Sequence, residues 1–400
     1  MTTAVWRVPT PRPGNGPGEP KYPRGIAAIS SDTLVPAGPR VSRVLLVASQ
    51  LQDDSMGRSF LRVAQELVRR ELAVGLLWGG GTLAAEIEAM GLSSCLCESL
   101  WLPSDPLFLP RAAVACAREF DPEVIHLFGC PLARWGMRLS RAIAAPYVLS
   151  VMSFPPPVGD ARLPGQWKQG SILALSEEVR QGLVNQGRIP KEAIAVIPMG
   201  IAIEDYESYR ETDRTSHVPV IGTVGPLAAE RGCDVFLRAA KIILERGHEA
   251  QFVVAGDGPE GEHLRHLARE LIIEKWVTFV PEYRDYRRMI SVLDICVIPA
   301  LEEGISLNVI EAMACRKPVV ASGVGDAYDV IKDGHTGFLA SKRDPHGMAE
   351  KIIHLMEDRD LARRLVEAAY TTVCERFSLT ACVDHLLSFY SWCVARAEGH

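Results

Sequence analysis

The sequence has no long apolar run and little excess of positive charge. Its first 20 residues, MTTAVWRVPTPRPGNGPGEP, lack the apolar centre of a secretory signal peptide. No uninterrupted apolar stretch approaches the roughly 20 residues that a membrane-spanning helix needs. The 43 Lys and Arg residues stand against 49 Asp and Glu, for a net charge of −6, whereas a nucleic-acid-binding protein would want a basic surface. We therefore expect a cytoplasmic protein with no transmembrane segment and no nucleic-acid partner.

Metal-binding patterns are missing as well. The ten cysteines are scattered and include no pair of CxxC knuckles, and the ten histidines include no HExxH. The neighbouring carboxylates Asp53 and Asp54 are more typical of a charged surface loop than of a metal site. Several cysteines fall in apolar stretches, where a reduced thiol packs like a small hydrophobe. We expect reduced cysteines, a reducing compartment and no metal.

Length and composition predict two domains. A 400-residue chain that is 48% apolar and 23% charged has ordinary globular composition. Residues 1–40 contain eight prolines and five glycines and are predicted to be a disordered leader. Beyond them, strand and helix patterns alternate, which predicts α/β domains with parallel sheets. The polar stretch 202–217 is interpreted as a linker between an N-terminal domain (41–205) and a C-terminal domain (206–378), followed by a last helix (379–400).

A candidate site lies in residues 302–312, EEGISLNVIEA. A strand pattern ends just before it, and Gly304 permits a tight turn. Ser306 is a good N-cap residue, so we expect a helix to begin at Leu307. The segment is therefore predicted to pass from a strand through a short loop into a helix.

Two glutamates flank the start of this helix. Glu303 is expected on the loop and Glu311 in the second helical turn, about 10 Å apart at 1.5 Å per helical residue. Between them, the amides of Ser306, Leu307 and Asn308 form a helix N-terminus, which attracts anions. A nucleotide-sugar presents groups in the matching order: sugar hydroxyls, diphosphate, ribose hydroxyls. The simpler alternative is one solvated glutamate on a loop and another on a helix face.

A longer string around this segment resembles the signature of the retaining glycosyltransferases of family 4. It reads IPALEEGISLNVIEAMACRKPVVASGVGDAYDVIKDGHTGFL, and the similarity extends to VGPLAAERGCDVFLRAA, VVAGDGPEGEHLRHLA and LALSEEVRQGLVNQGRIPKEAIAVIPMGI. The resemblance implies the α/β GT-B fold: two doubly wound, Rossmann-like parallel-sheet domains with an interdomain cleft. It also implies that the last helix crosses back to the first domain. The activity it implies is that of a retaining, metal-independent hexosyltransferase with no cofactor beyond a UDP-, GDP- or ADP-sugar donor.

The resemblance assigns roles to individual residues. Glu303 and Glu311, the two ends of an EX7E motif, would contact the donor sugar and the ribose. The amides of Ser306 and Leu307 would hold the phosphate, and Arg231 would neutralise the leaving diphosphate. Further donor-binding residues are Gly225, Gly256, Gly258, Gly304 and Asn308, and the residues expected at the acceptor or in the cleft are Gly57, His126 and Met152.

Several polar residues of the family's site are replaced. Pro226 stands where the family has an arginine, and Met152 stands where it has a histidine near the reacting centre. Met199 and Ala202 replace a further Asn and Asp. These changes motivate a second hypothesis, a catalytically impaired GT-B protein that acts as a nucleotide- or glycan-binding or scaffold protein. The acceptor of the first hypothesis is left open between a glycan, a lipid-linked molecule and a small molecule.

Two other patterns have simple explanations. Gly256–Gly261 fits the GxGxxG dinucleotide fingerprint, but no acidic residue ends the next strand in the usual place, so NAD is not expected. Arg134, Arg138 and Arg141 could form a basic helix face for peripheral membrane contact, although a solvated helix face is the simpler interpretation.

Overall fold

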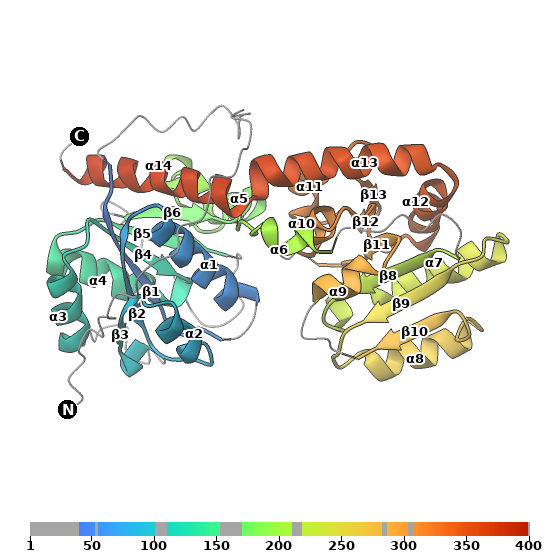
Figure 1. The fold of residues 1–400 in the computed structure, drawn as a ribbon, viewed down its shortest axis with the longest axis horizontal. Coiled ribbons are helices and arrows are strands. Elements are labelled where there is room, and N and C mark those ends of the chain that lie inside the picture. The colour runs from blue at the N-terminus through green and yellow to red at the C-terminus, as the bar shows by residue number, and fades with distance from the viewer. Residues whose placement is uncertain are drawn as a thin grey trace. The chain divides into compact units, whose positions relative to one another are not determined.

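The chain forms two compact α/β units in the computed structural model. The structure describes residues 40–52, 55–100, 110–152, 170–209, 218–281, 286–302 and 307–398. The first unit runs to Gly200 and is completed by the segment that begins at Leu379, and the second unit is Ile201–Ser378 (Figure 1). The predicted leader lies outside the described residues, apart from Arg40 at its end.

The first unit is built on a parallel sheet. Within the described residues its strands run in the order β3-β2-β1-β4-β5-β6-β7 (Figure 1). They are β1 Arg43–Ala48, β2 Ala73–Trp78, β3 Ser93–Leu96, β4 Val124–Phe128, β5 Tyr147–Val151, β6 Gly170–Ala174 and β7 Ile194–Val196. The helices are α1 Ser55–Arg69, α2 Ala84–Ala89, α3 Arg111–Phe120, α4 Ala133–Ile143, α5 Glu177–Asn185 and α14 Leu379–Ala397. The strand order reverses direction between β1 and β4, which makes the sheet doubly wound.

The second unit repeats this plan. Its described strands run in the order β10-β9-β8-β11-β12-β13, and every pair is parallel. They are β8 Val220–Val224, β9 Gln251–Ala255, β10 Val277–Val280, β11 Ile295–Ile298, β12 Val319–Ser322 and β13 Phe338–Ala340. The helices are α6 Glu204–Glu207, α7 Cys233–Glu245, α8 Gly261–Glu270, α9 Tyr286–Ser291, α10 Leu307–Ala314, α11 Ala327–Val330, α12 Pro345–Glu357 and α13 Arg359–Thr372. The prediction of two doubly wound, Rossmann-like domains is confirmed.

Burial on both sheet faces explains the apolar strand sequences. Four successive residues of β1, Val44 to Val47, are completely buried, so side chains on both faces of the strand are covered. This is expected of a parallel sheet between two helical layers. Helix starts follow equally local rules. The Ser176 hydroxyl accepts a hydrogen bond from the amide of Val179 (3.2 Å) at the start of α5, and Asp358 caps α13 in the same way.

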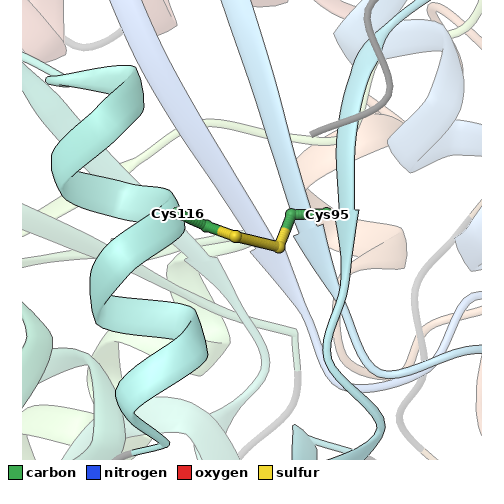
Figure 2. Close-up of a disulfide and its surroundings, with 2 residues drawn as sticks. All are labelled: Cys95 and Cys116. Carbon is green, nitrogen blue, oxygen red and sulfur yellow. A yellow bond between two sulfur atoms is a disulfide. The ribbon is translucent and has the colours of Figure 1, made fainter. Parts of the chain in front are cut away.

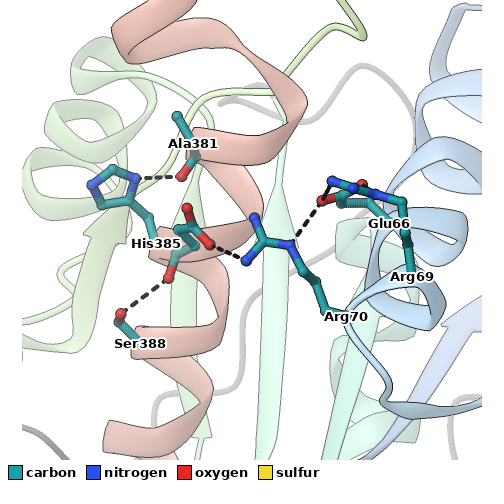
Figure 3. A network of polar contacts seen from close by, with 7 residues as sticks. Glu66, Arg69, Arg70, Ala381, His385 and Ser388 are labelled. Carbon is teal, nitrogen blue, oxygen red and sulfur yellow. Dashed lines mark hydrogen bonds and ion pairs between the residues drawn. The ribbon is translucent and has the colours of Figure 1, made fainter. Parts of the chain in front are cut away.

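Helix α14 packs into the first unit, against α1. Arg70, the residue directly after α1, forms an ion pair with Asp384 of α14 (2.7 Å), and it also donates to Glu66, as does Arg69 (Figure 3). Burial by itself would raise the pKa of Glu66, but the hydrogen bonds from the two arginines outweigh it and lower the pKa. On α14 itself, His385 and Ser388 bond to main-chain carbonyls one turn earlier (Figure 3).

The interpretation of residues 202–217 as a linker is wrong for the part that the structure describes. Residues 204–207 form α6, and the side chain of Tyr206 is buried. The amide of Ile201 bonds to the carbonyl of Phe377 (2.9 Å), which ties the start of this segment to the second unit. The segment looked like a linker because its charged residues outnumber its few apolar side chains, which are nevertheless the ones that pack. Residues 210–217 lie outside the described residues.

The expectation that all cysteines are reduced is wrong for one pair. Cys95 at the edge strand β3 and Cys116 in α3 form a disulfide (Figure 2). They lie 21 residues apart in the sequence, so only the packing of α3 beside β3 brings them together. Elsewhere burial raises the pKa of the Cys130 thiol to about 11 and that of Cys296 to about 12, so both are unreactive thiols near neutral pH.

Close packing of α4 on β4 gives a stability prediction. A Cβ atom at Gly136 of α4 would lie 1.8 Å from Cδ1 of Leu127 in β4. We expect Gly136→Ala to lower the free energy of unfolding by about 1–3 kcal/mol, the usual cost of overpacking, as measured by urea denaturation. In a Leu127→Ala background the added methyl group has room, so there the same substitution should cost nothing. An equal cost in both backgrounds would show that the two residues do not press on one another.

Candidate functional site

Two glycine turns of the second unit meet at the carboxyl ends of β8 and β9. The amide of Gly225, which follows β8, donates to the carbonyl of Ala255 at the end of β9 (2.9 Å). A Cβ atom at Gly256 would lie 1.9 Å from the carbonyl oxygen of Gly225, at a φ of +148°. Only glycine fits there, because the two backbones touch. Ligands of open α/β sheets bind beyond this edge of the sheet.

The turn after β9 continues the same contact. The amide of Leu227 donates to the carbonyl of Asp257 (2.8 Å), and the amide of Glu260 donates to the carbonyl of Leu227 (2.9 Å). A Cβ atom at Gly258 would lie 2.4 Å from that same carbonyl. The glycines of the GxG pattern are therefore required by the packing of one turn on the other.

Helix α10 begins beside the first of these turns. Asn308, in its first turn, donates through Nδ2 to the carbonyl of Val224 at the end of β8 (3.0 Å). The same amide nitrogen would lie 3.1 Å from a Cβ atom at Gly225. The predicted helix is present from Leu307, the residue at which the described part of the chain resumes. The structure thus brings together Gly225, Gly256, Leu307 and Asn308.

Glu311 lies further along α10 and is held by a buried tyrosine. The hydroxyl of Tyr206 donates to Oε1 of Glu311 (2.8 Å). The guanidinium group of Arg287 lies 5.8 Å from the ring centre of Tyr206 and 5.6 Å from that of Tyr209, and it forms an ion pair with Asp205 (3.4 Å). Sequence reasoning missed this cluster because it assigned residues 202–217 to a linker. The signal was the pair of tyrosines three residues apart, which share one face.

Arg231 lies beside the end of β11. It ends a short 3-10 helix, Ala229–Arg231, in which the carbonyl of Glu230 accepts a hydrogen bond from the amide of Leu301 (2.7 Å). The next residue, Gly232, would place a Cβ atom 2.1 Å from the carbonyl oxygen of Pro299. The side chain of Arg231 is half-buried and forms no ion pair with any residue that the structure describes. A cation is therefore available next to the strand that leads into residues 302–312.

The remaining donor-side residues are not placed. Glu303, Gly304 and Ser306 lie outside the described residues, so the expected distance of about 10 Å between the two glutamates stays a prediction. The Pro226 side chain is exposed in the turn after β8.

Gly57 of the first unit has a packing role. A Cβ atom there would lie 2.1 Å from the carbonyl oxygen of Gln52 and 2.8 Å from Cδ1 of Leu83. Helix α1 thus touches the loop after β1 at this point, and a side chain would force them apart. The close approach of two backbones is enough to explain the glycine.

His126 lies within β4 and is buried. Its Nδ1 is 2.5 Å from the hydroxyl of Tyr390 in α14, and its Nε2 is 2.7 Å from the hydroxyl of Ser150 in β5. Burial lowers the pKa of His126 to about 3 and raises that of Tyr390 well above its usual value. The neutral ring donates through one nitrogen and accepts through the other. His126 therefore links two strands to α14 without carrying charge.

Met152 follows β5 and shares a pocket with His126. The pocket opens at the carboxyl ends of β4 to β7, and its lining does not include Gly57. The structure thus brings together two of the three residues expected on the acceptor side.

The described part of the chain has neither a metal-binding cluster nor a membrane-spanning helix. Its His, Cys, Asp and Glu side chains nowhere form a group of three or more that could hold a metal ion. None of the helices described is both long and apolar enough to cross a membrane.

The buried histidine gives a pH prediction. Between about pH 3 and pH 6.5 the unfolded chain binds a proton at His126 that the folded chain does not bind, so the free energy of unfolding falls as the pH falls. One proton corresponds to about 1.4 kcal/mol per pH unit. We expect His126→Asn to show a smaller slope than the wild type in urea denaturation between pH 6.5 and 4.5. The exposed-site control His335→Gln should keep the wild-type slope, and equal slopes in all three proteins would mean that His126 protonates in the folded state.

Comparison with known proteins agrees with this geometry. Residues 218–358, most of the second unit, match the family model described as Glycosyl transferases group 1. The chain is 28% identical over 234 residues to alpha-D-kanosaminyltransferase from Streptomyces kanamyceticus. The aligned region covers 56% of this chain and 60% of that protein. The chain spans about half the length of the curated relatives that it matches.

Solved structures match over most of the chain. A glycosyltransferase from Rickettsia africae superposes with a TM-score of 0.75 at 19% identity, covering 87% of this chain and 98% of that one. Anabaena HepE in complex with UDP superposes with a TM-score of 0.73 at 17% identity, covering 86% and 98%. At such identities the likeness concerns the fold, and the chain therefore has the GT-B fold of these glycosyltransferases.

Proposed function

We propose that the protein is a retaining glycosyltransferase that moves a hexose from a nucleotide-sugar to an acceptor without a metal ion. The observation that carries the proposal is the assembly at the carboxyl edge of the second sheet, where Gly225, Asn308 and Glu311 flank the start of α10. The family match of residues 218–358 covers these residues. HepE has been solved with UDP and with UDP-glucose, so a UDP-sugar is the first donor to test, with GDP- and ADP-sugars next.

The donor is proposed to lie along the start of α10. The first amides of the helix, at Leu307 and Asn308, lack partners within the helix and would bind the diphosphate. Asn308 is itself fixed by its bond to the carbonyl of Val224. Glu311, one turn later, would accept hydrogen bonds from the two ribose hydroxyls. Its hydrogen bond from Tyr206 holds one carboxylate oxygen in place.

The chemistry is proposed to be electrostatic. As the bond between the sugar and the diphosphate breaks, negative charge grows on the phosphate oxygens. Arg231 would neutralise that charge, helped by the helix amides, because positioned positive groups stabilise a transition state in which charge develops. Glu303 would bind the sugar hydroxyls and so fix the anomeric carbon against the incoming acceptor hydroxyl, on the same face that the diphosphate leaves. The acceptor hydroxyl would give its proton to the departing diphosphate oxygen on that face, so this scheme needs no proton transfer at the position of Met152.

The first unit is proposed to bind the acceptor. Its sheet edge carries a pocket that contains Met152 and the neutral ring of His126, and neither can serve as a proton acceptor of useful strength near pH 7. The alternative, a catalytically impaired protein, would bind the nucleotide but transfer no sugar, so the turnover of the wild-type protein separates the two hypotheses.

Nucleotide binding tests the role of Glu311. We expect UDP at 100 times its dissociation constant to stabilise the protein by about 2.7 kcal/mol, seen as a higher melting temperature. Glu311→Gln should weaken UDP binding by roughly 10- to 100-fold, since a hydrogen bond to a charged group contributes about 1.5–3 kcal/mol. Tyr206→Phe, which keeps the ring under Arg287, should weaken it less. Glu262→Gln on the exposed face of α8 is the matched control and should bind UDP like the wild type. A melting temperature that does not change with UDP but rises with GDP or ADP would mean that the donor carries guanine or adenine instead of uracil.

Turnover tests the role of Arg231. We expect Arg231→Ala to lower kcat by about 10²- to 10³-fold, as the loss of one charge-stabilising group does, with a much smaller effect on UDP binding. Arg238→Ala, on the exposed face of α7, should keep wild-type turnover, and the proton NMR spectrum of the product should show the donor's anomeric configuration. Wild-type turnover in Arg231→Ala would mean that the site is misplaced. A wild-type protein that binds the nucleotide but transfers no sugar would favour the impaired alternative.

A further inference from the structure

The pocket of the first unit has a markedly apolar lining. It occupies about 510 Å³, including the space at its open mouth, and draws its walls from α1, the ends of β4 to β7 and α14. The lining residues are Ser59, Phe60, Val63, His126, Phe128, Ser150, Met152, Leu173, Leu175, Ile197, Pro198, Met199, Gly200, Cys382, Val383 and Leu386. Among these described residues, the only side chains with nitrogen or oxygen atoms are those of Ser59, His126 and Ser150.

Two of the three polar side chains in the lining, those of His126 and Ser150, are already bonded to one another. Both ring nitrogens of His126 are hydrogen-bonded, one to Tyr390 and one to Ser150. A hydroxyl-rich ligand placed deep in this pocket would lose its bonds to water and find few new ones, which costs free energy for each unpaired group. A hydrocarbon group loses nothing and gains from leaving water.

The two methionines strengthen this point. Met152 follows β5 and Met199 follows β7, and both are only partly buried. Both stand where the resemblance in the sequence predicts a polar residue. An unbranched thioether side chain is flexible and polarizable, and it adapts to apolar ligands of varied shape.

Charge and size narrow the occupant. A nucleoside diphosphate would need cations or free amides around its phosphates, and none of the described lining residues is charged. A second copy of the chain would need an interface of about 1,000 Å² or more, whereas this feature is a single concave pocket.

We propose that this pocket binds an uncharged alkyl group of the acceptor, next to the hydroxyl that receives the sugar. The inference rests on the proposed glycosyl transfer and names the chemical class of its second substrate. It narrows the choice between a glycan, a lipid-linked molecule and a small molecule to acceptors that carry a hydrocarbon portion.

Binding of two glucosides to the full-length protein tests the inference without requiring turnover. The probes are octyl β-D-glucopyranoside, used below its micelle concentration, and methyl β-D-glucopyranoside, which has the same sugar and no chain. Each fully buried methylene strengthens binding by about fourfold. We therefore expect the octyl compound to bind at least tenfold more tightly than the methyl compound in isothermal titration calorimetry.

Matched variants on α1 locate the binding. Val63 lines the pocket, and Val68 on the same helix is 45% exposed. Val63→Glu should weaken binding of octyl glucoside at least tenfold, and Val68→Glu should leave it within twofold of the wild type. Val63→Thr keeps the shape of valine and should weaken it several-fold, so the test survives if Val63→Glu melts at a lower temperature.

Three outcomes would overturn the inference. The first is equal affinity of the protein for the two glucosides. The second is an equal loss of octyl glucoside binding in Val63→Glu and Val68→Glu. The third is a protein that does not bind octyl glucoside but self-associates, with the self-association abolished in Val63→Glu. The last result would assign the pocket to a second copy of the chain. UDP binding and transfer from UDP-glucose are measured on the same samples. Transfer of glucose to methyl glucoside but not to octyl glucoside would contradict the inference and support the proposed function. Binding of octyl glucoside without any sugar transfer would support an alkyl-binding pocket and contradict the proposed function.

Discussion

Both units depend on one constraint, which is that a parallel sheet brings the carboxyl ends of all its strands to the same edge. The backbone at that edge leaves the sheet and needs new hydrogen-bond partners. In the second unit the two turns after β8 and β9 supply them for each other: Gly225 donates to Ala255, and Leu227 exchanges bonds with Asp257 and Glu260. This contact leaves no room for side chains at Gly256 and Gly258. The surface beyond it therefore presents main-chain groups and the start of α10, and a phosphate group can approach closely there.

The first unit closes the same edge with side chains. His126, Ser150 and Tyr390 form a buried hydrogen-bonded chain that links β4, β5 and α14, three segments far apart in the sequence. These three side chains are uncharged, because burial lowers the pKa of His126 to about 3 and raises the pKa of Tyr390 well above its usual value. Arg70 and Asp384 add an ion pair between α1 and α14 at the partly exposed side of this packing. Since His126, Ser150 and Tyr390 satisfy one another, these three side chains can lie beside an apolar pocket without an unpaired ring nitrogen at its base.

The sequence allowed the fold class to be predicted because apolar runs and helical periodicity are local signals. The strand that ends before residue 302 and the helix from Leu307 were both predicted. What failed depends on contacts between distant segments. Tyr206 was assigned to a linker because its partner, Glu311, lies 105 positions away. Cys95 and Cys116 meet only through the packing of α3 beside β3. His126 was expected at the acceptor because of its position in a motif, and the sequence carries no local sign that Tyr390 engages it.

The replaced polar residues fall on both units of the structure. Pro226 is an exposed residue of a turn, and Met152 and Met199 line the apolar pocket of the first unit. The groups that we propose to bind the donor, namely Arg231, Asn308 and Glu311, belong to the second unit, where each is placed by backbone or tyrosine contacts. The replacements that share one environment are those of the first unit, where two positions that are polar in the resembled family, 152 and 199, carry methionines that line the apolar pocket. The same substitutions are what an enzyme needs when its donor stays a nucleotide-sugar and its acceptor becomes hydrophobic, because a buried polar side chain without a partner would oppose binding of a hydrocarbon group.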